Sequence, residues 1–210
     1  MNGANKGILI AIEGIDGTGK STQVGLLAQY LRGRGCEVVV TREPTDGPCG
    51  RRIRELFVNR SRCTPEEELT LFIEDRRQHV RELIAPALAQ GHVVLTDRYY
   101  FSTAAYQGAA GMDPAEVFVR NRFAPRPDLV ILLTMQPEAS LARIRESRGE
   151  QLNDFEQEDQ LRRVAELFAS FDDPCITRIA ADDSLENVAW EIQRAVDRLL
   201  LDKLHQCPRP

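Results

Sequence analysis

The hydrophobic positions of this 210-residue chain fall into two kinds of segment. Short runs rich in β-branched residues alternate with longer segments whose apolar residues recur every three or four positions, as expected for buried strands between amphipathic helices. The predicted strands are Ile8–Glu13, Glu37–Thr41, Val93–Asp97, Leu129–Thr134 and Ile176–Ile179. The predicted helices are Lys20–Arg32, Pro48–Asn59, Pro65–Ala89, Pro114–Phe123, Pro137–Arg145, Phe155–Phe171 and Leu185–Leu204.

The start of the longest predicted helix inside the chain is marked most clearly. Thr64 stands where an N-cap is expected, Pro65 at the first helical position and Glu67 at the third, which is the pattern of a capping box. Gly91 is expected to end this helix. Because strands alternate with helices, we predict an α/β fold of three layers, a five-stranded parallel sheet flanked by helices on both faces.

Composition and charge narrow the function. Apolar residues make up 42% and the net charge is −5, so a packed core is expected and a nucleic-acid polymer is a poor partner. Basic residues nevertheless gather locally, in a way that suits small anionic ligands, at Arg51, Arg52 and Arg54, at Arg76 and Arg77, and at Arg143, Arg145 and Arg148. There is no repeat, low-complexity tract or clear linker, so residues 1–210 are interpreted as one domain.

The cellular location is predicted from the absence of a membrane-spanning run and of a signal peptide. No apolar run approaches the ~20 residues that span a bilayer, and the N-terminus lacks the apolar stretch of a signal peptide. The five cysteines are scattered and form neither a CxxC pair nor a metal-binding spacing, so reduced thiols are expected. We predict a cytoplasmic protein with no membrane partner.

The segment "GIDGTGKST" carries the first sign of chemistry. It matches G-x-x-x-x-G-K-[ST] between a predicted strand and a predicted helix, the context in which backbone N–H groups and a helix N-terminus surround phosphates. Lys20 would reach the β- and γ-phosphates, and the Ser21 hydroxyl would ligate Mg²⁺. The candidate ATP-binding residues are Gly14, Ile15, Asp16, Gly17, Thr18, Gly19, Lys20, Ser21 and Thr22. Hydrolase, kinase and passive binder stay open at this point, whereas the Asn-Lys-x-Asp segment of a GTPase is absent.

A second segment, "VVLTDRYYFSTAAYQG", delivers an acid and an arginine to the carboxyl end of a predicted strand, where ligands bind in open α/β sheets. Asp97 is placed to assist Ser21 in holding Mg²⁺, and Arg98 to bridge phosphates with its planar fork of donors. A surface Asp-Arg pair would be the plainer interpretation. The residues that follow, Ser102, Thr103, Tyr106 and Gln107, have the spacing of one helix face and are candidate substrate ligands.

At this point a family resemblance becomes specific. "DRYYFSTAAYQG" resembles the D-R-Y-x-x-S-x-x-A-Y-Q-G signature of bacterial thymidylate kinases, and "EGIDGTGKSTQ", "TREP" and "LFIEDRRQHV" resemble three further family segments in the same order. The resemblance covers roughly residues 8–200. It implies a P-loop nucleoside monophosphate kinase fold with a small lid, about residues 143–157, and acceptor-binding helices, about residues 48–90. The implied activity is transfer of the γ-phosphoryl group of ATP to thymidine monophosphate, with Mg²⁺, in dTTP biosynthesis.

The resemblance also implies which residues hold the acceptor base. Phe72 would stack on the thymine ring, Arg76 would donate to its carbonyl oxygen, and Thr103 would lie near its edge. An aromatic face and a guanidinium four residues apart lie on one side of a helix, which fits recognition of a planar base. By periodicity alone, a core aromatic on a long helix is the favoured interpretation of Phe72.

Four further roles follow from the same resemblance. Tyr106 would crowd the ribose 2′ carbon and so select deoxynucleotides, and Asp16 would lie near the 3′-hydroxyl. Glu43 belongs to the loop that faces the acceptor, and Arg54 would grip its phosphate, although a solvated helix face explains Arg54 nearly as well.

The predicted lid differs from the family pattern. Since the P-loop offers no arginine beside Gly17 and Thr18, the resemblance implies that the lid supplies one, and Arg148 is preferred to Arg143 and Arg145. The family's Asp-Arg is Asn153-Asp154 here, so a negative charge replaces the positive charge that the family pattern places in the lid. The glycine pair that usually follows "REP" is Thr45-Asp46 here, a departure that bears on the shape of the acceptor loop and on the strictness of thymine preference.

The predicted mechanism is in-line transfer between two bound nucleotides. The acceptor phosphate is already anionic, so no strong base is needed, and the predicted catalytic residues are Lys20, Arg98, Asp16, Arg148 and Arg143. The alternatives are a kinase of another deoxynucleoside monophosphate or of a deoxynucleoside and, less favoured, an ATP-dependent switch protein. The family resemblance further implies a homodimer.

Overall fold

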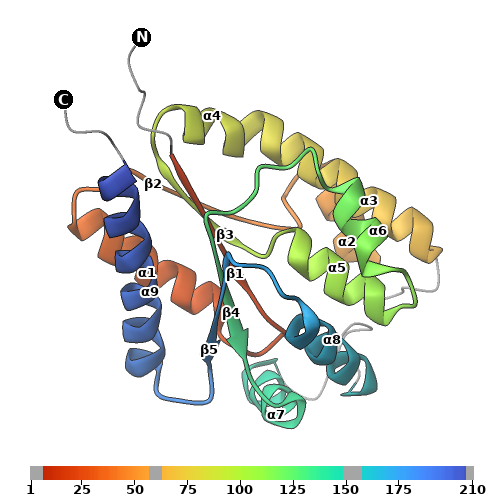
Figure 1. Ribbon diagram of the computed structural model, residues 1–210. Coiled ribbons are helices and arrows are strands. Elements are labelled where there is room, and N and C mark those ends of the chain that lie inside the picture. Colours follow the sequence, from red (N-terminus) through yellow and green to blue (C-terminus); the bar gives the residue numbers. More distant parts are fainter. Residues whose placement is uncertain (1–6, 57–62, 149–157, 207–210) are drawn as a thin grey trace.

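A sheet of five parallel strands forms the middle layer of the molecule in the computed structural model, which describes residues 7–56, 63–148 and 158–206 (Figure 1). The strands are β1 (Ile8–Glu13), β2 (Val38–Arg42), β3 (Val93–Asp97), β4 (Leu129–Thr134) and β5 (Ile176–Ala180), in the order β2-β3-β1-β4-β5. The predicted α/β class and the parallel sheet are confirmed. β2 begins and ends one residue later than predicted, and β5 ends one residue later.

Helices connect the strands. They are α1 (Lys20–Gly33), α2 (Pro48–Leu56), α3 (Pro65–His79), the π-helix η2 (Val80–Ile84), α4 (Ala85–Ala89), α5 (Tyr100–Ala109), α6 (Pro114–Arg120), α7 (Pro137–Arg148), α8 (Glu158–Ser170) and α9 (Leu185–Gln206). The last predicted residues of the second helix, 57–59, and the first of the sixth, 155–157, lie outside the described residues. The fourth predicted helix ends earlier than expected, at Arg120.

The predicted helix Pro65–Ala89 is continuous but not uniform. It begins with the predicted capping box, in which Thr64 and Glu67 each accept from the other's backbone N–H. It then widens into the π-helical turn of η2 directly before Pro86. The proline has no N–H to donate and its ring would collide with the carbonyl of Glu82 in a regular α-helix. The π turn therefore lies where the regular hydrogen-bond pattern cannot continue.

The two faces of the sheet build two apolar clusters. Along β1, Leu9 and Ala11 point to one cluster and Ile10 and Ile12 to the other, as the two-residue period of a strand requires. Side chains of α3, α5 and α8 cover the first face, and those of α1 and α9 cover the second (Figure 1). Both faces of β1 are buried, which explains its unbroken apolar sequence.

The strand order fixes where a ligand can lie. β1 pairs with β3 on one side and with β4 on the other. The chain therefore first forms the strands on one side of β1, which are β2 and β3, and then crosses to the other side to form β4 and β5. Crevices at the carboxyl ends of strands form at such points. In the register, Ile12 lies opposite Asp97, so the loop after β1 and the Asp97-Arg98 pair after β3 meet at one edge.

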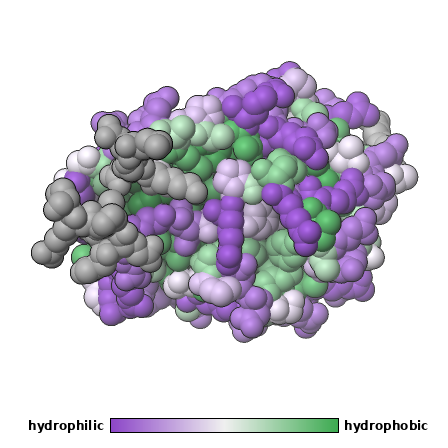
Figure 2. Space-filling model, turned by 45° about the horizontal axis from the view of Figure 1, so that its top comes forward, coloured by the Kyte–Doolittle hydropathy of each residue, from purple (hydrophilic) through white to green (hydrophobic). Residues whose placement is uncertain are grey.

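The surface of the described residues gives little further information about function. On the face in Figure 2, hydrophilic side chains predominate and break up the apolar areas. In the described part of the chain, none of the helices has the length and apolarity needed to cross a membrane. Cys36, Cys49, Cys63 and Cys175 are free thiols, as expected.

Candidate active site

The loop between β1 and α1 has a backbone that only glycine adopts readily. Gly14, Gly17 and Gly19 have φ angles of 137°, 81° and 86°. A Cβ on Gly14 would lie 2.4 Å from the Leu133 carbonyl oxygen, and one on Gly17 would lie 2.6 Å from that of Ser140. All three glycines therefore serve the turn, and Gly14 and Gly17 also permit the close approach of β4 and α7.

Lys20 begins α1 and is buried, with its Nζ donating to the Ile15 carbonyl at 2.8 Å. Burial, followed by repulsion from Arg98, lowers the pKa of Lys20 from 10.5 to about 8, although Asp16, Asp97 and Glu13 act in the opposite direction. An anion bound beside Nζ would restore the pKa, because an opposite charge favours the ammonium form. The environment of Lys20 is thus one that an anionic ligand improves.

Ser21 and Asp97, the two predicted Mg²⁺ ligands, are in direct contact. The Ser21 hydroxyl donates to the Asp97 carboxylate, which joins the N-terminus of α1 to the end of β3. A hydroxyl and a carboxylate are oxygen donors of the kind that Mg²⁺ takes, and this ion completes its shell with water and phosphate oxygens. Among the described residues, no group of three or more His, Cys, Asp or Glu side chains is placed to hold a metal ion.

Arg98 lies between the phosphate loop and α5. Its Nη2 donates to Asp16 at 2.6 Å, and its Nη1 donates to the Ser102 hydroxyl at 2.9 Å and to the Gly14 carbonyl at 3.3 Å. Tyr106 donates to the other oxygen of Asp16 at 2.9 Å. Burial would raise the pKa of Asp16, but Arg98, then Lys20 and Tyr106, lower it to about 2. Asp16 of the loop, Arg98 after β3, and Ser102 and Tyr106 of α5 thus form one charged network.

The guanidinium of Arg76 is almost fully used by the protein itself. It is 1% exposed and makes four hydrogen bonds: two to Glu43 Oε2, at 2.9 and 2.5 Å, one to Asn121 at 2.5 Å and one to Thr103 at 2.9 Å. A guanidinium has five N–H donors, so one on Nη1 remains without a partner among the described residues. Phe72, one turn earlier on α3, is half-buried.

Glu43 holds Arg76 from the acceptor loop. Burial would raise the pKa of Glu43, but Arg76 and His79 lower it, so the carboxylate form is favoured. His79 Nδ1 lies 3.0 Å from Glu43 Oε1 and its Nε2 lies 2.7 Å from the Thr41 hydroxyl. Because a carboxylate only accepts, Nδ1 carries the proton. β2, the acceptor loop and α3 are tied together by this chain of bonds.

Two predicted substrate residues on α5 are occupied by other parts of the protein. Gln107 is fully buried and its amide nitrogen donates to Glu68 at 2.5 Å, while its carbonyl oxygen has no partner among the described residues. Ser102 donates to the carboxylate of Glu13, at the end of β1. These contacts bind α5 to α3 and to the central strand.

The Thr45-Asp46 departure has a visible structural effect. Thr45 donates from its backbone N–H and its hydroxyl to Asp75, at 2.8 and 2.6 Å. Asp46 accepts from Arg54 at 2.9 Å and from Arg42 at 3.0 Å. Arg54, the candidate phosphate ligand, also donates to the Pro44 carbonyl at 3.0 Å. A carboxylate therefore already neutralises the arginine that the resemblance assigns to the acceptor phosphate.

The lid prediction lies mostly outside the described residues. Residues 149–157, including Asn153 and Asp154, are not described, and neither is the side chain of Arg148 at the end of α7. Arg143 is exposed and donates to the Ala181 carbonyl at 2.9 Å. α7 itself lies against the phosphate loop, since Ser140 donates to the Asp16 carbonyl.

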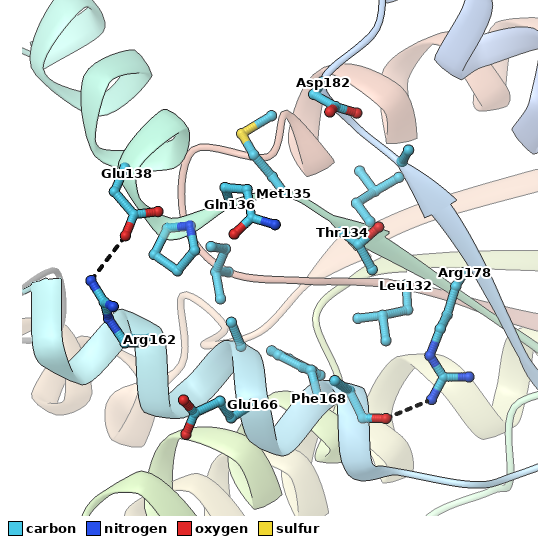
Figure 3. A pocket seen from close by; sticks show the side chains of 16 residues that line it. Leu132, Thr134, Met135, Gln136, Glu138, Arg162, Glu166, Phe168, Arg178 and Asp182 are labelled. Carbon is cyan, nitrogen blue, oxygen red and sulfur yellow. Dashed lines mark hydrogen bonds and ion pairs between the residues drawn. The ribbon is translucent and has the colours of Figure 1, made fainter.

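Two hollows border these groups. One, of about 670 Å³, extends from Ser21 and Asp97 to Thr45 and His79, and so joins the metal candidates to the acceptor loop. The other, of about 510 Å³, lies between α7, α8 and the ends of β4 and β5 (Figure 3). Its rim carries the Arg162–Glu138 pair, and Ile15 is the one sequence candidate in its lining.

Several residues around the site were not found from the sequence. Asn121 and His79 orient Arg76 and Glu43, Asp75 fixes the acceptor loop, and Glu13 supports α5. Three of them left a partial signal, Glu13 as an acid that ends an apolar run and Asp75 and His79 as members of the family-like segment "LFIEDRRQHV", although no role was predicted for them. Asn121 contacts Arg76 across 45 positions, a separation that spacing in the sequence does not reveal.

Comparison with known proteins agrees with this geometry. The sequence profile of the family described as thymidylate kinase matches residues 12–192. A thymidylate kinase of Desulfotalea psychrophila is 50% identical over 196 residues, which cover 93% of this chain and 97% of that protein. Those of Xanthomonas euvesicatoria and Xanthomonas oryzae are 46% and 43% identical over 198 residues, 94% of this chain and 87% and 86% of theirs. The chain belongs to the thymidylate kinase family.

Proposed function

We propose that this protein transfers the γ-phosphoryl group of ATP to thymidine monophosphate and so forms thymidine diphosphate. The observation that carries the proposal is the position of Arg98, whose guanidinium contacts the phosphate loop and α5 at the same time. A group placed there can reach the facing phosphates of two nucleotides. Membership of the thymidylate kinase family supports the same reaction and acceptor.

Electrostatic stabilisation is the main chemistry assigned to the donor side. ATP would lie on residues 14–22, with Lys20 on its β- and γ-phosphates and Arg98 on the group in transfer. Ser21 and Asp97 would hold Mg²⁺, which when bound offsets charge on the phosphate oxygens. The acceptor phosphate is itself the nucleophile and is already anionic, so a general base is not required.

Recognition of the base is assigned to α3 and α5. Phe72 would stack on the thymine ring, and the remaining Nη1 hydrogen of Arg76 would donate to a ring carbonyl. Cytosine carries an amino group where thymine has this carbonyl. Its N–H would face the N–H of Arg76, so two hydrogen-bond donors would oppose each other. Tyr106 would exclude a 2′-hydroxyl, and Arg54 would leave Asp46 to grip the acceptor phosphate.

A lid arginine would help to neutralise the negative charge of the phosphoryl group in the transition state. Arg143 is a candidate only if it leaves the Ala181 carbonyl, whereas Arg148 stays a prediction from the sequence. A homodimer formed through helices and a cytoplasmic location are also proposals, supported by the family resemblance. Light scattering on the purified protein tests the first, with a mass of about twice the 23.7 kDa chain expected.

The test of the acceptor is ADP release with ATP and a panel of nucleoside monophosphates. Thymidine monophosphate should give the highest kcat/KM, with deoxyuridine monophosphate next and cytidine and purine monophosphates far lower. A flat response would leave nucleotide binding intact and defeat the assignment of the acceptor. ADP release without any acceptor would favour the switch protein.

Arg54→Ala separates a monophosphate kinase from a nucleoside kinase. A nucleoside lacks the phosphate that Arg54 would bind, so the variant should raise KM for thymidine monophosphate about tenfold, the scale of one partly exposed charged hydrogen bond. An unchanged KM would favour the nucleoside as acceptor. Arg51→Ala, on the same helix and bonded only to the Asp46 carbonyl among described contacts, serves as the matched control.

A further inference from the structure

Glu13 is a buried acid that the mechanism above does not use. It ends β1, is fully buried, and faces the first turn of α5. Its Oε1 accepts from the backbone N–H of Tyr99 at 2.9 Å and of Ser102 at 3.1 Å, and its Oε2 accepts from the Ser102 hydroxyl. A carboxylate that is buried in this way needs a structural or functional reason, because desolvating its charge is costly.

The first reason is a missing cap. The N-cap residue of α5, Tyr99, makes no side-chain cap bond, so the free N–H groups of this helix need another acceptor. Glu13 supplies it from a different strand, 86 residues earlier in the chain. A negative charge at a helix N-terminus also interacts favourably with the helix dipole. α5 is thereby attached to the strand that carries the phosphate loop.

The second reason is the backbone of Arg98. Its φ is 71°, and among the described residues it is the one non-glycine with a positive φ. Such a conformation costs of the order of 1–3 kcal/mol and persists only where its surroundings hold it. Here the Arg98 N–H donates to Ile12, its carbonyl accepts from Thr96, and the next N–H donates to Glu13.

The third reason is the Arg98 side chain. Ser102 donates its hydroxyl proton to Glu13 and accepts from Arg98 Nη1 through the same oxygen. With its proton fixed on Glu13, the Ser102 oxygen presents its lone pairs to the guanidinium. We call these two hydrogen bonds, from Arg98 to Ser102 and from Ser102 to Glu13, the relay. They keep this direction only while Glu13 accepts.

We propose that Glu13 is a positioning residue for phosphoryl transfer, which holds Arg98 toward the phosphates by capping α5 and orienting the Ser102 hydroxyl. The inference rests on the proposed function, because Arg98 acts only if two phosphates meet beside it. Glu13 itself touches neither nucleotide in this account. Its loss should therefore lower kcat and leave the KM for ATP nearly unchanged.

The charge of Glu13 gives the proposal a pH signature. Burial raises the pKa of Glu13 from 4.5 to about 7, against the opposing effects of Ser102 and Arg98. The charged groups that act on it are Arg98 and, from α1, Lys20. Protonation turns one oxygen into a donor, so the Ser102 hydroxyl would lose its acceptor and the relay would break. Wild-type protein below pH 7 should then behave like a variant with a neutral amide.

The experiment compares wild type, Glu13→Gln, Ser102→Ala and the double variant in steady-state ADP release with ATP and thymidine monophosphate. At pH 8.5, Glu13→Gln should lower kcat about tenfold to a hundredfold, as expected when a catalytic group is displaced, and change the KM for ATP less than twofold. At pH 6, where about a tenth of Glu13 is still ionised, the difference from wild type should shrink to about twofold if it was tenfold and to about tenfold if it was a hundredfold. The double variant should lose no more than Ser102→Ala alone, because both changes break one relay.

Asp128→Asn is the matched control. Asp128 accepts from the Leu9 N–H at 2.8 Å, at the opposite end of the same strand, and pairs with Lys203. This variant should lower the melting temperature and leave kcat unchanged at both pH values. If Glu13→Gln behaves like it, or if its deficit is the same at pH 6 and 8.5, Glu13 supports only the fold and the inference is wrong.

The activity of the wild-type protein distinguishes failure of the proposed function from failure of this inference. A wild type that makes no thymidine diphosphate defeats the proposed function, whereas an active wild type with an equally active Glu13→Gln defeats only the inference. If Glu13→Gln does not fold, Ser102→Ala decides, since it leaves the carboxylate and both backbone bonds in place. It must then lower kcat at least tenfold, and a smaller loss contradicts the proposal.

Discussion

The ATP-binding (donor) half and the acceptor-binding half of the site hold their positively charged side chains in different ways. On the donor side, Lys20 is bonded to a backbone carbonyl and its pKa is lowered by burial, so it gains from an arriving anion. On the acceptor side, Arg76 is bonded to Glu43, Asn121 and Thr103, which leaves one of its N–H donors without a partner in the described part of the chain. The difference follows from the ligands: a triphosphate needs unpaired positive charge, whereas an uncharged base needs one donor held in a fixed direction.

The largest expected effect tests the donor half. Lys20→Ala should lower kcat about 1000-fold, the upper range for removal of one transition-state donor, and change the KM for thymidine monophosphate less than threefold. Steady-state ADP release measures both. Lys203→Ala, which removes a lysine paired with Asp128 away from the site, should leave kcat unchanged. Comparable turnover by Lys20→Ala would remove its central role.

The next largest effect tests the acceptor half. Arg76→Lys keeps the charge but cannot reproduce the planar fork shared by Glu43, Asn121 and Thr103. The KM for thymidine monophosphate should rise about 100-fold while that for ATP stays within twofold. Arg77→Lys is the control, because Arg77 is exposed and pairs only with Glu74 among described ion pairs. Equal effects on both KM values would contradict the division of the site into two halves.

A third prediction concerns the charged network between the halves. The pKa of Asp16 is lowered from 3.8 to about 2, so its contribution to stability is present above pH 3.8 and lost as the pH falls toward 2. At pH 7, Asp16→Asn should reduce the free energy of unfolding by about 2 kcal/mol, from 1.36 kcal/mol per pKa unit. Urea unfolding at several pH values should show this difference shrinking between pH 4 and pH 2. A difference that does not depend on pH would mean that Asp16 is not held by Arg98.

The smallest expected effect concerns the Thr45-Asp46 departure. Asp46 is 75% exposed and must release Arg54 before a phosphate can bind there, and exposed ion pairs are worth up to about 1 kcal/mol. Asp46→Asn should therefore lower the KM for thymidine monophosphate about twofold to fivefold at low salt, with kcat unchanged. Glu74→Gln, another exposed paired acid, is the control. A raised KM would show that Asp46 helps the loop to bind the acceptor.

The strands and the phosphate loop were predictable because their signals are local. β1, β3 and β4 have the predicted bounds, and the glycines of the loop carry the positive φ angles that the motif requires. The π turn before Pro86 was missed, since one proline in a long apolar-periodic segment does not show how the helix accommodates it. Helix α5 was expected only as a face of residues, without its start at Tyr100.

By itself, the sequence determined the alternation of strands and helices, the phosphate loop, the Asp97-Arg98 pair and the family. These depend on periodicities and motifs within about twenty residues, which backbone geometry and burial dictate directly. Only the tertiary structure decided that Asn121 shares Arg76, that Asp46 neutralises Arg54 and that Glu13 caps α5. Buried donors take whichever acceptors the fold brings to them, and residues 8 to 86 positions apart become neighbours only once the sheet and its helices have packed.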